Sequence, residues 1–349
     1  MDLETKVALV KPGLLTNVLR ARITLLRRGV QLIAFVLLLY GAFIWPRPVE
    51  TFFPPIPSQE PRTTLYDRNR ILWVSGKESV VELYMPFLAC RFIARGGLFK
   101  SCTVHFLSEN ITWRTSLTIL LPHLLLFVAM CVLAGRFWCG WICPLGAMMD
   151  AMTGMRKALH LPRALVPPSW KCFLAKLRHF LLFLTLGVAV LITFPIFGRS
   201  GVNDSLFLIY CQFCPARLVY PPFGGVNPCW YDTTNSVTIF LTLVGWLCLG
   251  VFFLSFAIPR FWCRICAIGA LVSYFNRGAL LTLEKNHQRC TSCGACRRCC
   301  PMDIERVYRE QEKRVVTDTQ CLLCLTCVEE CPEEGCLQVK LLRGKVVQS

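Results

Sequence analysis

The sequence predicts an integral-membrane α-helical bundle of about four transmembrane helices with a two-fold internal repeat, followed by a C-terminal α+β domain. Three observations lead to this fold class: four long apolar stretches, two similar segments far apart in the chain, and two cysteine runs of one form near the C-terminus. The 349 residues are 54% hydrophobic, and their mean hydropathy is +0.50. Such a chain is more apolar than an ordinary soluble domain.

Each of the four apolar stretches approaches the roughly 17–25 residues that a helix needs to cross a bilayer. The stretches are about Val30–Trp45, Ser116–Gly135, Phe180–Phe197 and Val237–Ile258. The first is followed by Pro46, Arg47 and Pro48 rather than by a small-residue cleavage site. We therefore expect a retained anchor and not a cleaved signal peptide.

Basic residues orient the predicted bundle. The formal net charge is +17, and Lys and Arg concentrate in residues 1–28 and after the second stretch, whereas residues 198–236 hold only Arg199 and Arg217. The positive-inside rule then predicts both termini in the cytoplasm. No basic stripe is interleaved with stacking aromatics, which argues against nucleic acid as a partner. The predicted organisation is a basic cytoplasmic segment 1–28, a transmembrane domain 29–279 with outer loops 46–114 and 198–236, and a cytoplasmic domain 280–349.

Eight cysteines in the last of these domains form two runs of the same form, each followed by proline. They are Cys290-x2-Cys293-x2-Cys296-x3-Cys300-Pro301 and Cys321-x2-Cys324-x2-Cys327-x3-Cys331-Pro332. This is the ligand pattern of a ferredoxin-type domain with two [4Fe–4S] clusters, in which the fourth cysteine of each run binds the other cluster. The predicted ligand sets are Cys290, Cys293, Cys296 and Cys331 for cluster 1, and Cys321, Cys324, Cys327 and Cys300 for cluster 2.

The rest of the C-terminal domain fits this interpretation. Strands are expected at Leu281–Lys285, Lys313–Thr317 and Leu337–Leu341, with cysteine loops between them. Because this small domain has few large apolar side chains, we expect cluster binding to supply much of its folding free energy. Cys299 is surplus to the pattern. We expect Leu322, Leu323, Leu325 and Ile304 to exclude water from the clusters.

Two segments of the membrane half resemble each other: Arg136-Phe-Trp-Cys139-Gly-Trp-Ile-Cys143-Pro144 and Arg260-Phe-Trp-Cys263-Arg-Ile-Cys266-Ala267. Each follows an inward-running stretch, so we expect Trp138 and Trp262 at the lipid interface and Arg136 and Arg260 facing headgroups. Two interpretations of Cys139, Cys143, Cys263 and Cys266 stay open. They are inert thiols that fill helix packing, or they form an additional metal or redox site embedded in the membrane.

The predicted outer loops also hold cysteines. Cys211 and Cys214 form either disulfides or outward-facing redox or metal-binding thiols, and Cys90, Cys102 and Cys229 lie in the same loops. Two histidines, His123 and His179, fall at different depths of the bundle. We expect each to make polar contacts there rather than to share a haem. The chain has no phosphate loop, dinucleotide fingerprint or hydrolase triad, so nucleotide-dependent activity has no support.

With these motifs the chain resembles the membrane-bound polyferredoxins of the NapH, NosR and CcoG type. The resemblance extends from roughly Arg28 to the end and rests on Cys139-x3-Cys143-Pro144 together with the tandem cysteine runs. It implies a quinol-linked electron donor, or an accessory protein for metalloenzyme assembly, in the bacterial cytoplasmic membrane. One departure is visible, since Cys263-x2-Cys266-Ala267 is one residue shorter than the expected Cys-x3-Cys-Pro motif and lacks its proline.

The expected function is iron–sulfur electron transfer within an oxidoreductase system. The chain would relay electrons between the quinone pool or a cytoplasmic donor and a partner redox enzyme, with the lipid bilayer, quinone or quinol and redox subunits as partners. The alternative is an assembly or maturation factor that reduces a metal or a disulfide on the outer face through Cys211 and Cys214. A purely structural subunit would leave eight ligand-spaced cysteines unexplained.

Overall fold

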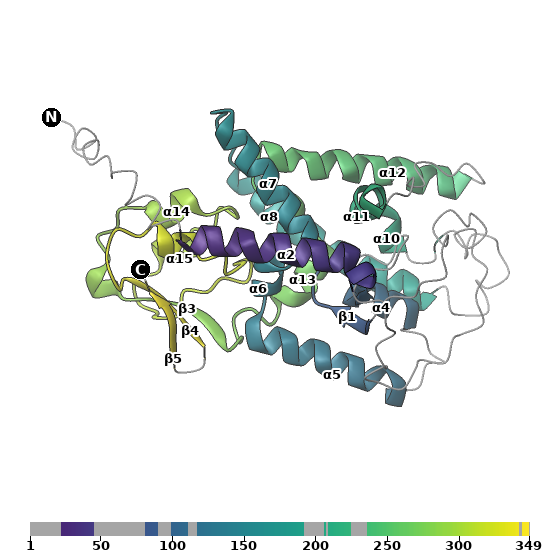
Figure 1. Cartoon of the computed structure of the whole chain (residues 1–349), viewed down its shortest axis with the longest axis horizontal. Coiled ribbons are helices and arrows are strands. Elements are labelled where there is room, and N and C mark those ends of the chain that lie inside the picture. Colours follow the sequence, from purple (N-terminus) through teal and green to yellow (C-terminus); the bar gives the residue numbers. More distant parts are fainter. Residues whose placement is uncertain are drawn as a thin grey trace.

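The computed structural model describes residues 22–44, 81–89, 99–110, 117–191, 206, 209–224, 236–341 and 344–348 (Figure 1). Its helices are α2 (Arg22–Ile44), α4 (Thr103–Asn110), α5 (Leu117–Ala134), α6 (Phe137–Trp141), α7 (Pro144–Ala158), α8 (Pro168–Leu191), α10 (Ile209–Phe213), α11 (Ala216–Val219), α12 (Ser236–Phe253), α13 (Ala267–Ser273), α14 (Ala295–Cys299), α15 (Arg306–Arg309) and α16 (Thr326–Glu329). Its strands are β1 (Val81–Met85), β2 (Phe99–Cys102), β3 (Leu281–Lys285), β4 (Leu337–Leu341) and β5 (Gly344–Gln348). Short 3-10 turns are η2 (Pro221–Gly224), η3 (Leu254–Phe256), η4 (Trp262–Arg264) and η5 (His287–Arg289).

Among the described residues, three helical segments are long and apolar enough to cross a membrane: Arg22–Gly41, Pro168–Leu191 and Ser236–Phe256. The second predicted stretch corresponds to α5, whose apolar part is the shorter Leu120–Ala134. Many apolar side chains on these helices face outward, and Leu32, Phe183 and Leu247 are 65%, 62% and 68% exposed. Large apolar side chains on so many exposed helix faces require an apolar solvent, which a bilayer provides.

Helix α8 begins twelve residues before the predicted stretch, at Pro168 rather than Phe180. Proline suits a first helical turn because its missing N–H would have no intrahelical partner there. The early part of α8 is basic, and its Lys171 donates to the carbonyl of Asp303, 3.2 Å away. Hydropathy locates only the apolar part of this helix, whereas its polar start packs against the C-terminal domain.

Residues 81–110, which fall in the predicted outer loop 46–114, contribute buried structure in their described part. Strands β1 and β2 pair in parallel, and α4 follows directly and contacts α8, α10 and α13. Phe87 and Phe106 are each 1% exposed. The Thr103 hydroxyl donates to the Met85 carbonyl, 3.0 Å away. Non-helical backbone inside a membrane bundle is tolerated where protein surrounds it, as it does here.

The C-terminal domain lies at one end of the molecule, and α2, α5 and α12 extend away from it (Figure 1). Strands β3, β4 and β5 form an antiparallel sheet in that order. The strands expected at Leu281–Lys285 and Leu337–Leu341 are present with those bounds. The prediction of a strand at Lys313–Thr317 is wrong, because this segment makes only an isolated bridge between Glu284 and Val315. Its Val316 is nevertheless fully buried and supports the sheet.

Candidate iron–sulfur centres

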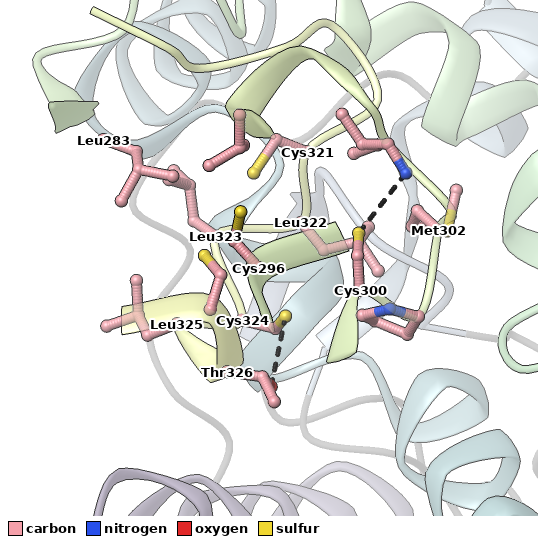
Figure 2. Close-up of a pocket in the computed structure, with 14 residues that line it drawn as sticks. Leu283, Cys296, Cys300, Met302, Cys321, Leu322, Leu323, Cys324, Leu325 and Thr326 are labelled. Atoms are coloured by element: carbon pink, nitrogen blue, oxygen red, sulfur yellow. Dashed lines mark hydrogen bonds between the residues drawn. The ribbon is translucent and has the colours of Figure 1, made fainter. Parts of the chain in front are cut away.

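The four predicted ligands of cluster 2 line one cavity together with Cys296, a predicted ligand of cluster 1 (Figure 2). Its empty volume is about 450 Å³, part of it open to solvent. Leu322, Leu323, Leu325 and Ile304 also line it, as expected for side chains that exclude water. Soft thiol donors in an apolar cavity match the chemistry of a [4Fe–4S] cluster. Within the cavity, the backbone N–H of Ile304 donates to Cys300 Sγ, 3.5 Å away.

Both cysteine runs wrap their sites with the same backbone conformation. The residue before the second cysteine and the residue after it have positive φ in each run: Ser292 (55°) and Gly294 (73°), then Leu323 (47°) and Leu325 (61°). A leucine in this region costs roughly 1–2 kcal/mol. Leu323 and Leu325 are 1% and 7% exposed, so burial of their side chains offsets that cost.

The first cysteine run has an additional thiol beside it. Cys336 lies within hydrogen-bonding reach of Cys290 and Cys331, two predicted ligands of cluster 1. Burial raises the pKa of the Cys336 thiol to about 12, so it stays protonated and can donate. Cys336 lies outside the spaced runs, so no sequence pattern identified it.

A buried cation accompanies the same site. Lys285 is 3% exposed, and its Nζ donates to the carbonyls of Tyr308 (3.2 Å) and Glu310 (2.9 Å). Burial alone would raise the pKa of Cys290, but the Ser292 N–H and the charge of Lys285 lower it below its usual value. Alternation along β3 could have revealed Lys285, because it shares the inward face with Leu283.

The four cysteines of the membrane half come together in the structure. Cys139, Cys143, Cys263 and Cys266 are 6–9% exposed, belong to one core cluster and lie within electrostatic reach of one another. We call this group the membrane cysteine site. In the described part of the chain, no three His, Cys, Asp or Glu side chains have the close spacing that a single ion needs. Four thiols on two facing segments are a donor set of the kind that holds a [4Fe–4S] cluster.

The two Arg-Phe-Trp-Cys segments hold each other's turns. Arg260 Nη1 donates to the Cys139 carbonyl at 2.8 Å, and Arg136 Nη2 donates to the Cys263 carbonyl at 3.1 Å. Both arginines are 1% exposed. The expectation that they face headgroups is therefore wrong, because each guanidinium satisfies a buried carbonyl of the other segment. Trp262 is also buried, at 4% exposure, rather than placed at a lipid interface.

The missing residue of the second motif is absorbed by a tighter turn. The first motif has the five-residue α6, whereas the second has the three-residue 3-10 turn η4. Cys143 and Cys266 still cap the next helix with nearly the same backbone angles, φ/ψ −57/118 and −56/124. Proline at the first helical position is favourable but not required. Ala267 therefore replaces Pro144 without changing the position of the cysteine before it.

Hydrogen-bond donors surround the membrane cysteine site. The backbone N–H groups of Gly146 and Leu88 point at Cys143, and that of Gly269 points at Cys266. The Tyr210 hydroxyl lies 3.4 Å from Cys266 Sγ. Burial raises the pKa of the Cys143 and Cys266 thiols above the usual value, and these donors act in the opposite direction, toward the thiolate form that a cluster requires.

A buried ionic network links helix α2 to this site. Asp150 accepts from Arg260 Nε at 2.7 Å and from Gln31 Nε2 at 2.8 Å, and Arg28 Nη1 lies 3.1 Å from it. Burial would raise the pKa of Asp150, but the ion pair with Arg260 holds it well below its usual range. Arg27 Nη1 donates to the Cys324 carbonyl at 2.9 Å. Arg27 and Arg28 thus lie inside α2, where Arg27 contacts the second cysteine run and Arg28 contacts Asp150.

The outer cysteines and the histidines occupy other positions. Cys211 and Cys214 are buried on and just after α10, and Cys102 is buried at the end of β2, whereas Cys90 and Cys229 lie outside the described residues. Cys102 and Cys214 lie within electrostatic reach of Tyr210.

His123 packs edge-on against Tyr84 with ring centroids 5.3 Å apart. His179 Nδ1 lies 3.0 Å from the Tyr274 hydroxyl. The two histidines therefore make separate contacts.

Known families match both halves of the chain. The model of the 4Fe-4S binding domain matches residues 117–162 and again 238–283, which contain the two membrane motifs. The model of the 4Fe-4S dicluster domain matches residues 282–332. Relatives named ferredoxin-type protein NapH are 25% identical over 224 residues in Escherichia coli and 24% identical over 211 residues in Haemophilus influenzae. These matches support a membrane polyferredoxin-type family for the chain.

Two further relatives widen this polyferredoxin-type group. YccM of Escherichia coli, whose name assigns it to electron transport, is 26% identical over 230 residues, which are 62% of this chain and 55% of YccM. MJ0750, an uncharacterised protein of Methanocaldococcus jannaschii, is 26% identical over 230 residues, covering 65% of this chain and 82% of its own length. The matches to NapH cover 67% of the Escherichia coli protein and 62% of the Haemophilus protein. No solved structure matches this chain. The matched domains support [4Fe–4S] clusters as its cofactors.

Proposed function

We propose that this polyferredoxin relays electrons across an integral-membrane path, between the quinone pool or a cytoplasmic donor and a partner redox enzyme. The tandem cysteine runs support one-electron chemistry. The exposed apolar helices support a membrane location. Relatives named as ferredoxin-type and electron transport proteins support the same function. The bacterial cytoplasmic membrane is the compartment that we propose.

The observation that carries this proposal is the direct contact between the cluster 2 loop and the membrane cysteine site. Trp141 Nε1, two residues from Cys139, donates to the Leu323 carbonyl at 2.9 Å. A Cβ added to Gly140 would lie 2.3 Å from the Leu322 carbonyl, so the two backbones touch. Electron transfer requires redox centres that lie close together, and this packing brings the cluster 2 loop next to the membrane cysteine site.

The proposed ligand sets follow the cysteine runs. Cluster 1 is held by Cys290, Cys293, Cys296 and Cys331, cluster 2 by Cys300, Cys321, Cys324 and Cys327, and a third group by the membrane cysteine site. A bound cluster supplies reversible one-electron oxidation and reduction. The protein residues hold the thiolates, donate N–H groups to the sulfurs and exclude water.

Two helix starts support the proposed topology. Thr24, near the start of α2, donates through its backbone N–H to Glu329 of the C-terminal domain at 3.2 Å. Lys171, near the start of α8, reaches Asp303 of the same domain. Both helices therefore leave from the side where the cluster domain sits. If that side is the cytoplasm, as the charge distribution predicts, both termini lie there.

Metal analysis combined with a redox titration tests the proposal. The full chain is purified without oxygen in lipid nanodiscs, and its iron and sulfide are counted before electron paramagnetic resonance of the reduced state. We expect about four iron atoms per cluster, with one cluster equivalent lost in Cys139→Ser and cluster signals re-oxidised by a water-soluble quinone analogue. Clusters that no quinone analogue re-oxidises would remove quinone from the proposal, and unchanged iron in Cys139→Ser would remove the third group.

A specific contact also supports assembly or maturation as a second candidate function. Tyr210 joins the α10 segment, which carries Cys211 and Cys214, to Cys266 of the membrane cysteine site. A disulfide between Cys211 and Cys214 would accept two electrons from this site, together with two protons, and become a dithiol. The dithiol would then reduce a disulfide or metal of a partner and return to the disulfide. The double variant Cys211→Ser with Cys214→Ser should then abolish partner maturation while cluster reduction is retained. Full maturation by this variant would exclude the idea.

A further inference from the structure

The interior of this protein carries far more buried positive than negative charge. Among the described residues, seven Lys or Arg side chains but only two acidic side chains are buried. An unpaired buried charge costs several kcal/mol, so the excess requires anionic groups nearby. A cluster bound by four thiolates is such a group. Three buried arginines contact the carbonyls of the predicted ligands Cys139, Cys263 and Cys324, and the half-buried Arg163 contacts that of Cys300.

Arg136 differs from its counterpart Arg260 in its partners. Arg260 forms an ion pair with Asp150, whereas no carboxylate of the described residues pairs with Arg136, which is also 1% exposed. The Nε of Arg136 has no hydrogen-bond acceptor in the described part of the chain. Its charge lies within electrostatic reach of Cys139 and Cys266. The position therefore calls for an anion at the membrane cysteine site.

The same guanidinium joins two centres. Nη2 donates to the Cys263 carbonyl at 3.1 Å, and Nη1 donates to the carbonyl of Gln320, the residue before Cys321, at 3.2 Å. The backbone N–H of Arg136 donates to Asn276 Oδ1 at 2.9 Å, and Asn276 Nδ2 donates to the Cys321 carbonyl at 3.0 Å. Arg136 and Asn276 thus fix the first ligand of cluster 2 against the membrane cysteine site.

We propose that Arg136 is the positioning residue of the electron-transfer junction between cluster 2 and the membrane cysteine site. Its charge stabilises the reduced, more negative state of the groups on either side, and its two N–H arms set the distance between them. This inference rests on the proposed function, because it requires a redox group at the membrane cysteine site.

Charge and geometry can be separated by two substitutions. Arg136→Gln removes the charge, so the midpoint potential of the membrane centre should fall and electron transfer from cluster 2 should slow. Arg136→Lys keeps the charge but cannot reproduce the fork, so the potential should stay close to wild type while transfer still slows. Arg277→Gln is the matched control, since Arg277 is an exposed cation next to Asn276 and has neither contact.

The experiment uses the full chain in nanodiscs, with iron counts, a titration monitored by electron paramagnetic resonance, and freeze-quench kinetics of cluster 2 re-oxidation. If wild type lacks the iron that Cys139→Ser removes, the third group of the proposed function fails. If wild type has that iron and both Arg136 variants match Arg277→Gln in potential and rate, only the role of Arg136 is overturned.

Iron loss in the variants is also decisive. Loss of the membrane-site iron in Arg136→Gln alone, with Arg136→Lys still loaded, supports the charge requirement. Loss of that iron in both variants, or of all iron in either, assigns Arg136 to folding and overturns the inference.

Discussion

Neutralising Asp150 should destabilise the membrane half more than any surface change of the same chemistry. In Asp150→Asn the side chain keeps its shape, but Arg260, at 1% exposure, loses the only buried acid among the described residues that contacts it. Removing one partner of a buried ion pair costs about 3–5 kcal/mol, because the remaining charge stays in a poorly solvating interior. For a unit of 150–250 residues this corresponds to an apparent midpoint lower by about 6–20 °C.

Thermal unfolding in a fixed detergent, followed by circular dichroism, measures this effect. Glu312→Gln is the matched control, because Glu312 is exposed and its side chain makes no described ion pair; surface changes of this kind stay within about 0.5 kcal/mol. Arg260→Gln combined with Asp150→Asn should cost less than the sum of the single changes, since the buried guanidinium of Arg260 is removed together with its partner. The double variant should still be less stable than wild type, because Arg27 and Arg28 also lose Asp150. An Asp150→Asn midpoint equal to that of Glu312→Gln would refute the claim that the network holds α2 and the two cysteine turns together.

Three other changes test separate parts of the structure. Gly140→Ala should loosen the contact with Leu322 and slow the re-oxidation of cluster 2, because the added Cβ would lie 2.3 Å from the Leu322 carbonyl. Gly154→Ala is the control: its added Cβ has nothing within 4 Å, so this change should be neutral or stabilise helix α7 by about 0.5–1 kcal/mol. Equal re-oxidation rates in the two variants would exclude the Gly140 contact as an electron route. Cys336→Ala should lower the midpoint potential of cluster 1 without loss of iron, because it removes a thiol donor near Cys290 and Cys331. Cys172→Ala is the control, since Cys172 is exposed. An unchanged potential in Cys336→Ala would contradict a hydrogen bond from Cys336 to these ligands. Burial would raise the pKa of Glu305, but its pKa lies below the usual value because of the charges of Arg309, Lys171 and Arg297. The stability that Glu305 contributes is therefore complete above pH 4.5 and is lost as pH falls through the lower pKa of the folded state. Hydrogen exchange around Lys171 should rise in that pH range, and the same pH profile in Glu305→Gln would exclude Glu305 as the cause.

The sequence predicted the C-terminal domain in detail because its chemistry is local. Cysteine spacing indicates where a thiolate loop must wrap, and the strands at Leu281–Lys285 and Leu337–Leu341 have alternating side chains. The segment Lys313–Thr317 has the same β-branched character but makes only a single bridge. Strand formation depends on a partner along its whole length, and that is a tertiary property which composition does not reveal.

The sequence did not predict the positions of the buried arginines in the membrane half. Hydropathy located the apolar helices, but the rule that places Arg at headgroups assigned Arg136 and Arg260 to the membrane edge. Each instead reaches a carbonyl or carboxylate contributed by a distant segment. Their partners, among them Asp150 and Gln320, have no fixed sequence offset from the arginines. Only the folded chain shows which carbonyls would otherwise be buried without a donor.

The arginines also explain why the shorter second motif retains its cysteine positions. A Cys-x2-Cys turn would normally point its second thiol differently from a Cys-x3-Cys turn. Here the Cys263 carbonyl is fixed by Arg136, and the Cys139 carbonyl is fixed by Arg260. Each motif is held by the other, so the second motif accommodates its missing residue locally: the 3-10 turn η4 takes the place that α6 has in the first motif, and Cys266 stays at the N-cap of α13. The two halves therefore constrain one shared group of four cysteines, and a change in either motif should alter the positions of all four.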